Sequence, residues 1–237
     1  MQVIGIKTPL FKNKDNLINF IFDNISSMED GDILAITSKI IALSQCRTAK
    51  LKDKNNLIIN NSKETIKFSD VFLTFTDEGW CINAGIDESN ANHKVILLPK
   101  DIFKTVEFIR TKMLKHFCLK KLGILITDTK SLPLRVGTIG RTIGYTGFEP
   151  LRSYVGEKDL FGKKSRFTKS NIADALSACA VLIMGEGNEK TPMVVIKNAP
   201  VKFTNRSNIN KKNTNLSISP EKDIFLYAYK NFEKNKK

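Results

Sequence analysis

The order of strand-like and helix-like segments is the feature that most constrains the fold of this chain. Short apolar runs such as ILAIT (33–37), LGILIT (122–127) and PMVVIK (192–197) predict buried strands. Longer amphipathic stretches at 15–25 and 101–117, the latter capped by its Asp, predict helices. The two kinds of segment do not alternate regularly, and several strands are separated only by short turns. This order favours an α+β fold with largely antiparallel sheets over a doubly wound parallel sheet.

Further segments complete the expected fold. FLTFT (72–76) and WCIN (80–83) flank a Gly-containing turn, as in a β-hairpin. The Gly-rich segment 136–148 is β-like, and 171–184 predicts a helix of small residues that ends at Gly185.

Length and composition set broad limits on function. A chain of 237 residues is long enough for one large domain, and we expect a single domain over 1–237 with a mobile loop at 203–218. No apolar run approaches the roughly 20 residues of a membrane span, and the N-terminus lacks a signal-peptide pattern. We therefore expect a cytoplasmic protein with no membrane partner.

Charge and reactive side chains narrow the function classes. The net charge of +14 comes mostly from scattered lysines without interleaved aromatic residues, so nucleic acid is not the expected partner. The four cysteines are isolated, which argues against a zinc site or a disulfide framework. With only two histidines, catalysis by a nucleophile–histidine pair has little support.

Carboxylates at the ends of apolar runs are the main chemical signal. Asp87 lies in AGIDESN, Asp128 in ITDT and Glu186 in MGEG. Carboxylate oxygens are the ligands that hard divalent cations prefer, and such cations commonly act on phosphates. We therefore expect metal-assisted chemistry on a nucleotide, although the sequence has neither GxxxxGK[ST] nor GxGxxG.

Each of these residues also has a purely structural interpretation. Asp87 could close a turn on its own backbone, and Asp128 could simply end a strand. Gly185 could be a helix C-cap that leaves Glu186 in solvent. Taken singly, the structural interpretation of each residue is at least as strong as the functional one.

Several motifs occur together and in order along the chain. They are GDILAITSK (31–39), NAGIDESN (83–90), LLP (97–99), ILITDT (124–129), the segment with Arg135, Gly137 and Gly140, YVGEKDLFG (154–162) and ADALSACAVLIMGEG (173–187). In this order they resemble the coenzyme F420-0:L-glutamate ligase family, the γ-glutamyl ligases, over nearly the whole chain. With this resemblance, the functional interpretation of the carboxylates is favoured over the structural one.

The resemblance implies a fold, an activity and a set of partners. The fold is that of the F420 γ-glutamyl ligases, in an intertwined homodimer. The activity couples hydrolysis of a nucleotide triphosphate, usually GTP, to amide formation between L-glutamate and the carboxylate of a pterin- or deazaflavin-type acceptor. The expected cofactors are two Mg²⁺ or Mn²⁺ ions on the phosphates, with K⁺ as a further candidate. Transfer of the γ-phosphoryl group would activate the acceptor as an acyl phosphate.

The resemblance also implies roles for individual residues. Asp87 and Asp128 would ligate one divalent ion, while Thr129 and Glu186 would help to hold the other. Backbone N–H groups of the turn after the small-residue helix could cradle phosphate. The residues that would contact the nucleotide are Asn90, Thr8, Pro9, Leu10, Phe11, Ser38, Lys39 and the turn from Met184 to Thr191, which includes Gly185, Glu186, Gly187, Asn188 and Glu189.

Two arginines are candidates for holding the acid substrates. Arg135 and Arg152 could each pair bidentately with a substrate carboxylate. We group Arg135 with Asp87 and Asp128 as catalytic residues. Trp80 could stack on an aromatic acceptor, although a packing role in the hairpin is favoured.

One position departs from the family pattern, and the acceptor stays open. Leu43 stands where the family usually carries a second lysine, so either Lys39 supplies the positive charge alone or the nucleotide binds differently. The turn DEGW (77–80) and the start KTPLF (7–11) resemble a bacterial branch that is proposed to act on folates. The sequence therefore leaves open F420-0 or a folate as acceptor, GTP or ATP as nucleotide, and the number of glutamates added. A non-catalytic nucleotide- or RNA-binding protein on a degenerate ligase fold is the alternative from another class.

Overall fold

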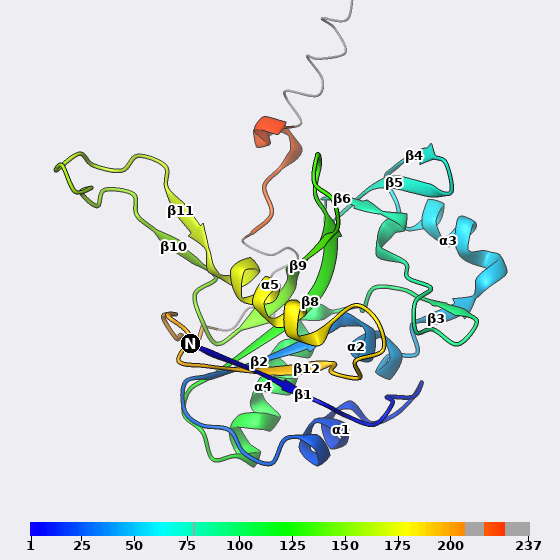
Figure 1. The fold of residues 1–237 in the computed structure, drawn as a ribbon, viewed down its shortest axis with the longest axis horizontal. Coiled ribbons are helices and arrows are strands. Elements are labelled where there is room, and N and C mark those ends of the chain that lie inside the picture. Colours follow the sequence, from blue (N-terminus) through cyan, green and yellow to red (C-terminus); the bar gives the residue numbers. More distant parts are fainter. Residues whose placement is uncertain (78, 207–215, 226–237) are drawn as a thin grey trace, which may run out of the picture.

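A computed structural model describes residues 1–77, 79–206 and 216–225 of the chain. A five-stranded mixed sheet in the order β1-β12-β2-β8-β9 forms its centre (Figure 1). Among these strands, β2 and β8 are parallel neighbours and the other pairs are antiparallel. The bounds are Gln2–Ile6 (β1), Asp32–Thr37 (β2), Leu122–Ser131 (β8), Thr138–Thr146 (β9) and Met193–Lys197 (β12). The predicted α+β fold with largely antiparallel sheets is confirmed.

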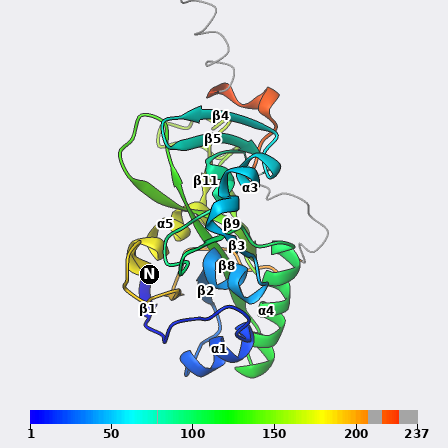
Figure 2. The ribbon, with the colours of Figure 1, turned by 90° about the vertical axis from the view of Figure 1, so that its right-hand side faces the viewer.

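Buried apolar side chains fix the central strands between two helices. The runs 32–36 in β2 and 122–127 in β8 are buried along their whole length. The helices α4 (Ile102–His116) and α5 (Ile172–Met184) pack against opposite faces of the sheet (Figure 2). Full burial of a large apolar side chain contributes roughly 1.5–3 kcal/mol to folding. On α4, such side chains recur at helical spacing and join the core at Phe103, Val106, Ile109 and Met113.

A three-stranded antiparallel sheet in the order β4-β5-β6 lies beside the β8–β9 hairpin (Figure 1). Its β5–β6 hairpin confirms the prediction for FLTFT and WCIN. The other elements are α1 (Leu17–Asn24), α2 (Ser38–Ser44), β3 (Thr48–Lys50), the 3-10 helix η1 (Leu51–Asp53), α3 (Lys54–Asn60), β4 (Glu64–Phe68), β5 (Val71–Thr76), β6 (Gly79–Ile82), η2 (Asn83–Gly85), β7 (Lys94–Ile96), β10 (Leu151–Ser153), β11 (Lys169–Asn171) and η3 (Pro220–Lys222).

The predicted helices are present, with differences at their first residues. The helix expected over 15–25 begins after Asn16, whose side chain accepts a hydrogen bond from the Asn19 N–H at 3.0 Å. Asp101 occupies the N-cap position of α4, but its side chain makes no capping hydrogen bond. Its carboxylate instead lies 3.3 Å from the Lys104 ammonium, and its φ of +48° is left-handed.

Two expectations concern segments that the structure describes only in part. The mobile loop predicted at 203–218 includes residues 207–215, which lie outside the described residues. No described helix is long and apolar enough to cross a membrane.

Candidate active site

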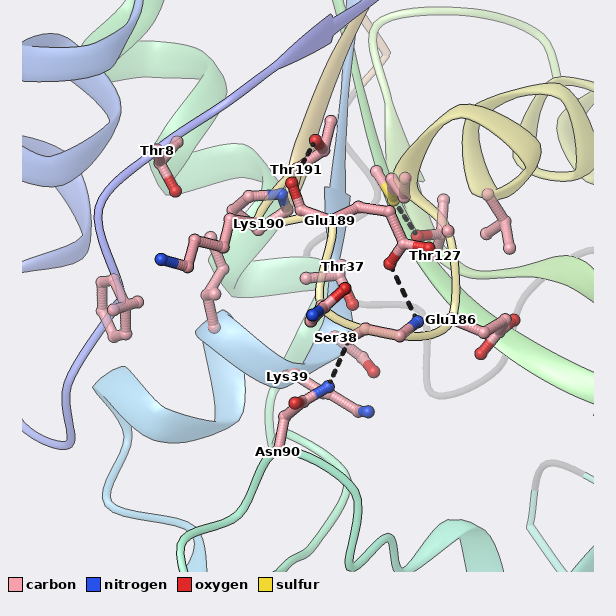
Figure 3. A pocket seen from close by; sticks show the side chains of 18 of the residues that line it. Thr8, Thr37, Ser38, Lys39, Asn90, Thr127, Glu186, Glu189, Lys190 and Thr191 are labelled. Atoms are coloured by element: carbon pink, nitrogen blue, oxygen red, sulfur yellow. Dashed lines mark hydrogen bonds between the residues drawn. The ribbon is translucent and has the colours of Figure 1, made fainter.

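A cavity of about 250 Å³ lies at the edge of the central sheet where β2 ends beside β8. Thr37, the last residue of β2, is paired with Thr127 of the parallel strand β8, and Thr37 and Asp128 both line the cavity there. The strand β8 continues past Asp128 to Ser131, so the interpretation that Asp128 ends a strand is wrong. The loop from Gly185 to Pro192, which joins α5 to β12, forms one wall, and the segment after β1 forms another (Figure 3).

The cavity brings together the predicted metal-binding and nucleotide-binding residues, but not Arg135, Arg152 or Trp80. The residues that it brings together come from the segment after β1, the start of α2, the loop before β7, the second half of β8, and the last residue of α5 with the loop that follows it. These residues are Thr8, Pro9, Leu10, Phe11, Ser38, Lys39, Asp87, Asn90, Asp128, Thr129, Met184, Gly185, Glu186, Gly187, Asn188 and Glu189.

Asp87 is held by a lysine and a serine. The Lys39 ammonium lies 2.7 Å from the Asp87 carboxylate and also donates to the Ser89 hydroxyl at 2.5 Å. The Ser89 N–H and hydroxyl donate to Asp87 at 2.7 and 2.9 Å. Burial alone would raise the pKa of Asp87, but the hydrogen bonds from Lys39 and Ser89 outweigh it, so that the pKa is lowered. Asp87 thus closes an Asx turn, as in its structural interpretation, and also faces the cavity.

Asp128 is the most enclosed carboxylate of the cavity. The Ser38 hydroxyl donates to it at 3.3 Å from the start of α2, and the Arg141 guanidinium lies 3.5 Å away on the neighbouring strand. Burial raises the pKa of Asp128, and the charge of Arg141 opposes this only in part. Arg141 was not among the predicted site residues.

Glu186 stands at the mouth of the cavity, directly after the α5 C-cap. Its carboxylate accepts a hydrogen bond from the Thr138 hydroxyl at 3.4 Å. Burial raises the pKa of Glu186, and so do the negative charges of Asp87 and Asp128, while Lys39 lowers it. Glu186 therefore lies close enough to Asp87 and Asp128 for their charges to affect it, although the three carboxylates come from distant segments.

This donor set suits a divalent cation. A bound positive ion would offset the repulsion that Glu186 feels from Asp87 and Asp128, and carboxylate oxygens are hard ligands. Each carboxylate has a different protein partner: Lys39 for Asp87, Arg141 for Asp128 and Thr138 for Glu186. In keeping with these separate partners, no group of three or more Asp, Glu, His or Cys among the described residues has a metal-binding arrangement.

The loop after α5 is closed by its own carboxylate. Gly185 has a φ of +74° and is the C-cap of α5, as its structural interpretation predicts. A Cβ at this position would overlap the Glu189 carboxyl group, which accepts a hydrogen bond from the Gly187 N–H at 2.9 Å. The Asn90 side chain donates to the Gly187 carbonyl at 2.9 Å (Figure 3). The Gly187 N–H, which we predicted could cradle phosphate, thus binds Glu189 in this structure.

One side of the cavity is apolar and the other is charged. The apolar side is formed by Phe11, Ile40, Leu43 and Ile96. Leu43, which stands where the family usually carries a lysine, is thus part of an apolar wall. Lys190 brings a second lysine to the lining, on the wall opposite α2 (Figure 3).

The remaining predicted residues lie elsewhere. Arg135 lies in the exposed turn of the β8–β9 hairpin and does not line the cavity. The Arg152 guanidinium stacks on the Tyr154 ring at 4.5 Å and lies 3.8 Å from Glu157. Trp80 packs against the Phe75 ring at 5.2 Å, which agrees with a packing role.

A family comparison covers the part of the chain that forms the cavity. The sequence model described as F420-0:Gamma-glutamyl ligase matches residues 5–198, which include every residue of the cavity lining.

Similar proteins carry the same description. A protein named coenzyme F420:L-glutamate ligase from Methanococcus maripaludis strain S2 is 34% identical over 86% of this chain and 91% of its own length. Proteins of that name from Methanocaldococcus jannaschii and Archaeoglobus fulgidus are 32% and 31% identical. The first of these covers 95% of this chain and 96% of the relative, and the second covers 80% and 84%.

Proposed function

The chain belongs to the F420-0:γ-glutamyl ligase family, and from this premise we propose that it is a GTP- and divalent-metal-dependent ligase. It would join the amine of L-glutamate to the carboxylate of a coenzyme F420-0-like acceptor. The single observation that carries this proposal is the convergence of Asp87, Asp128 and Glu186 on one cavity that is also lined by Lys39 and a glycine loop.

Mg²⁺ or Mn²⁺ would fit the acidic side of this cavity. We propose that Asp87 and Asp128 hold one ion and that Thr129 and Glu186 help to hold a second, with K⁺ as a further candidate. When bound, such ions neutralise phosphate oxygens and so make the γ-phosphoryl group easier to transfer. Metal ligation requires the ionised carboxylate, and burial raises the pKa values of Asp128 and Glu186, so we expect binding of the ion to compete with protons at these two groups.

The protein residues would position the nucleotide between the two sides of the cavity. The Lys39 ammonium can contact phosphate once Asp87 is engaged by another cation, and the Ser38 hydroxyl can donate from the start of α2. The apolar wall with Phe11 and Leu43 can cover the ring of the base.

The reaction would then proceed in two balanced steps. The acceptor carboxylate oxygen attacks the γ-phosphorus, the bond to the β-phosphate oxygen breaks, and GDP leaves. The glutamate α-amine attacks the carbonyl carbon of the acyl phosphate, inorganic phosphate leaves, and the amine loses a proton.

We further propose that the protein is a homodimer. The two long hairpins of the chain carry apolar side chains that are almost fully exposed in one copy, including Leu134, Val136, Leu160 and Phe161. Exposed apolar patches of this kind commonly mark an interface. A second copy is the partner that the family resemblance suggests.

Product analysis tests the proposal. The protein is incubated with Mn²⁺, GTP and L-glutamate, and with F420-0 or a folate in separate reactions, and the products are identified by mass spectrometry. Glutamylated F420-0 together with GDP is the expected result. A glutamylated folate with unchanged F420-0 would move the protein to a folate-type ligase with the same chemistry. Absence of any glutamylated product from a protein that binds GTP would support a non-catalytic nucleotide- or RNA-binding role.

A further inference from the structure

A second cavity, of about 140 Å³, lies apart from the active-site cavity. Its lining comes from the segment before β3, the residue after α3, the turn between β5 and β6, and the segment after β7. Of these elements, β3, α3, β5 and β6 lie together on the right of Figure 1. The two cavities share no lining residue, so the second is a hollow of its own.

One layer of backbone separates the two cavities. Asp87 and Ile96 pair through backbone hydrogen bonds of 3.0 and 2.8 Å, and both line the active-site cavity. Their chain neighbours Ile86 and Leu97 line the second cavity. Because side chains alternate along extended backbone, the two cavities lie on opposite faces of this layer. A molecule in the second cavity would therefore rest against the layer that carries Asp87 without occupying the active site.

The second cavity has an apolar floor. Ala84, Ile86 and Leu97 line it and are 5%, 5% and 7% exposed. A cavity of roughly 150 Å³ can hold a molecule as small as benzene, so this one suits a small organic molecule with an apolar part.

Arg47 supplies a positive group with donors to spare. Its Nε donates to the Leu98 carbonyl at 3.1 Å, which anchors one side of the guanidinium. Among the residues that the structure describes, nothing accepts a hydrogen bond from its two terminal nitrogens, and no carboxylate lies within 4.0 Å of it. A guanidinium with free terminal nitrogens is suited to pair with a planar carboxylate.

Asp77 supplies a negative group to the same cavity. Its carboxylate lies 2.5 Å from the Lys63 ammonium, but the two side chains are 77% and 59% exposed. Solvent screens such a pair, so the ammonium group of a ligand can replace Lys63 at low cost. A cation, an anion and an apolar floor in one small cavity match the carboxylate, the ammonium group and the side chain of an α-amino acid.

We propose that the second cavity binds a small α-amino acid with an apolar side chain, with its carboxylate on Arg47 and its ammonium group on Asp77. This site goes beyond the proposed ligase function and does not depend on it. The proposed function uses an amino acid only as a substrate, in the other cavity.

The test uses L-valine as the probe and isovalerate, which lacks the amine, as its matched acid. Arg47→Met removes the guanidinium, and Arg166→Met, at an exposed arginine outside both cavities, is its control. Asp77→Asn removes the negative charge, and Asp70→Asn, at an exposed turn residue, is its control. NMR titration of isotope-labelled protein measures each affinity and locates the ligand, and thermal unfolding checks that each variant is folded.

We expect L-valine to bind the wild type and to shift the amide resonances of Asn61 and Leu98, which line the second cavity, but not that of Gly187. Arg47→Met should weaken L-valine roughly tenfold or more, as for loss of a charge-assisted contact. Asp77→Asn should weaken L-valine and leave the weaker binding of isovalerate unchanged. Both control variants should bind L-valine like the wild type.

Several outcomes would overturn the inference. They are absence of L-valine binding to the wild type, equal binding to the wild type and a folded Arg47→Met variant, and shifts at Gly187 in place of Leu98. Isovalerate that binds as tightly as L-valine would show a site for simple acids and would overturn the assignment to amino acids. If Arg47→Met does not fold, Asp77→Asn decides, because unchanged L-valine binding in that variant contradicts the proposal. None of these results bears on whether the protein joins glutamate to an acceptor.

Discussion

The Lys39 ammonium lies 2.7 Å from the Asp87 carboxylate and so pairs the start of α2 with the loop before β7. The two side chains are 27% and 42% exposed, so solvent screens their attraction and the pair adds little to stability. A contact that contributes little to folding can be exchanged for contacts with a ligand at low cost. The pair is therefore well placed to separate when a cation meets Asp87 and a phosphate meets Lys39.

Replacement of Lys39 tests this exchange. We expect Lys39→Met to raise the KM for the triphosphate by roughly ten- to a hundredfold, which corresponds to a lost charge-assisted contact of about 1.5–3 kcal/mol. Lys7→Met, just before the cavity lining, is the control and should leave the KM unchanged. Steady-state kinetics with GTP as the varied substrate gives both values. An unchanged KM in Lys39→Met would mean that this lysine only neutralises Asp87.

Asp128 should matter for metal-dependent binding and not for folding. Asp128→Asn keeps the shape of the side chain, and we expect it to abolish the Mn²⁺-dependent part of GTP binding, measured by calorimetry. Loss of the carboxylate partner of Arg141 should destabilise the folded protein, whereas removal of a buried charge should stabilise it. We expect these two effects on the free energy of unfolding largely to cancel. GTP binding that is equal in the variant and the wild type would contradict the proposed ligand role.

The raised pKa of Asp128 also gives a pH dependence of stability. The folded state holds this proton more tightly than the unfolded state, whose pKa is near 3.8. The stability that this group provides is thus fully present below the unfolded pKa and is lost as the pH rises through the folded pKa. Urea unfolding of metal-free protein above pH 4 should show this decline in the wild type and a flatter curve in Asp128→Asn. Parallel stability curves for the wild type and Asp128→Asn would show that a group other than Asp128 causes the pH dependence.

Gly185 should be sensitive to substitution for two separable reasons. Gly185→Ala must place a side chain at a φ of +74° and must also displace the Glu189 carboxyl group. Gly156→Ala has a similar φ of +87° with nothing within 4 Å, so it isolates the backbone strain, of about 1 kcal/mol. We expect a larger loss of melting temperature for Gly185→Ala than for Gly156→Ala. Adding Glu189→Ala to Gly185→Ala should remove the part of the loss in melting temperature that exceeds the loss in Gly156→Ala. Equal losses in all variants would show that the Glu189 side chain moves aside at no cost.

The exposed hairpin tips predict the assembly state. Leu134 and Val136 are fully exposed in the isolated copy, so we expect them to be covered in a dimer. Light scattering should give a dimer mass at micromolar concentration, and Leu134→Ser with Val136→Ser should shift the protein toward the monomer. A stable wild-type monomer would contradict the proposed dimer.

The sequence predicted the elements of the fold much better than their arrangement. Apolar runs and the terminal Gly185 located the central strands and α5 closely, because burial and left-handed backbone leave a local signature. The pairing of β1 with β12 and the parallel pairing of β2 with β8 leave no such signature. Contacts between distant strands depend on how the whole sheet packs, which periodicity does not encode.

The same limit explains which site residues were found. Asp87, Asp128 and Glu186 were predicted because each stands in a recognisable motif, and the cavity does bring them together. Arg141 was missed because its contact with Asp128 depends on the strand register, which shifts at a bulge between Ile126 and Thr127. Arg135 stands in a matching motif, but its place in the hairpin turn keeps it outside the cavity of the single copy.

The antiparallel pairing of β1 with β12 joins the first and the last of the named strands in chain order, and the Thr8 N–H completes the connection by donating to the Lys190 carbonyl at 2.9 Å. On the ribosome, the first strand of this chain must therefore wait for nearly the whole protein before it gains its partner. GTP can stabilise only a state that already binds it, so it cannot assist folding of the nascent chain before β12 has emerged. Ribosome-bound chains that stop before β12 should gain no protection from proteolysis when GTP and Mn²⁺ are added, whereas chains extended well past Lys197 should gain it. Under the proposed function, protection by the nucleotide would then mark the point at which β12 has joined the sheet.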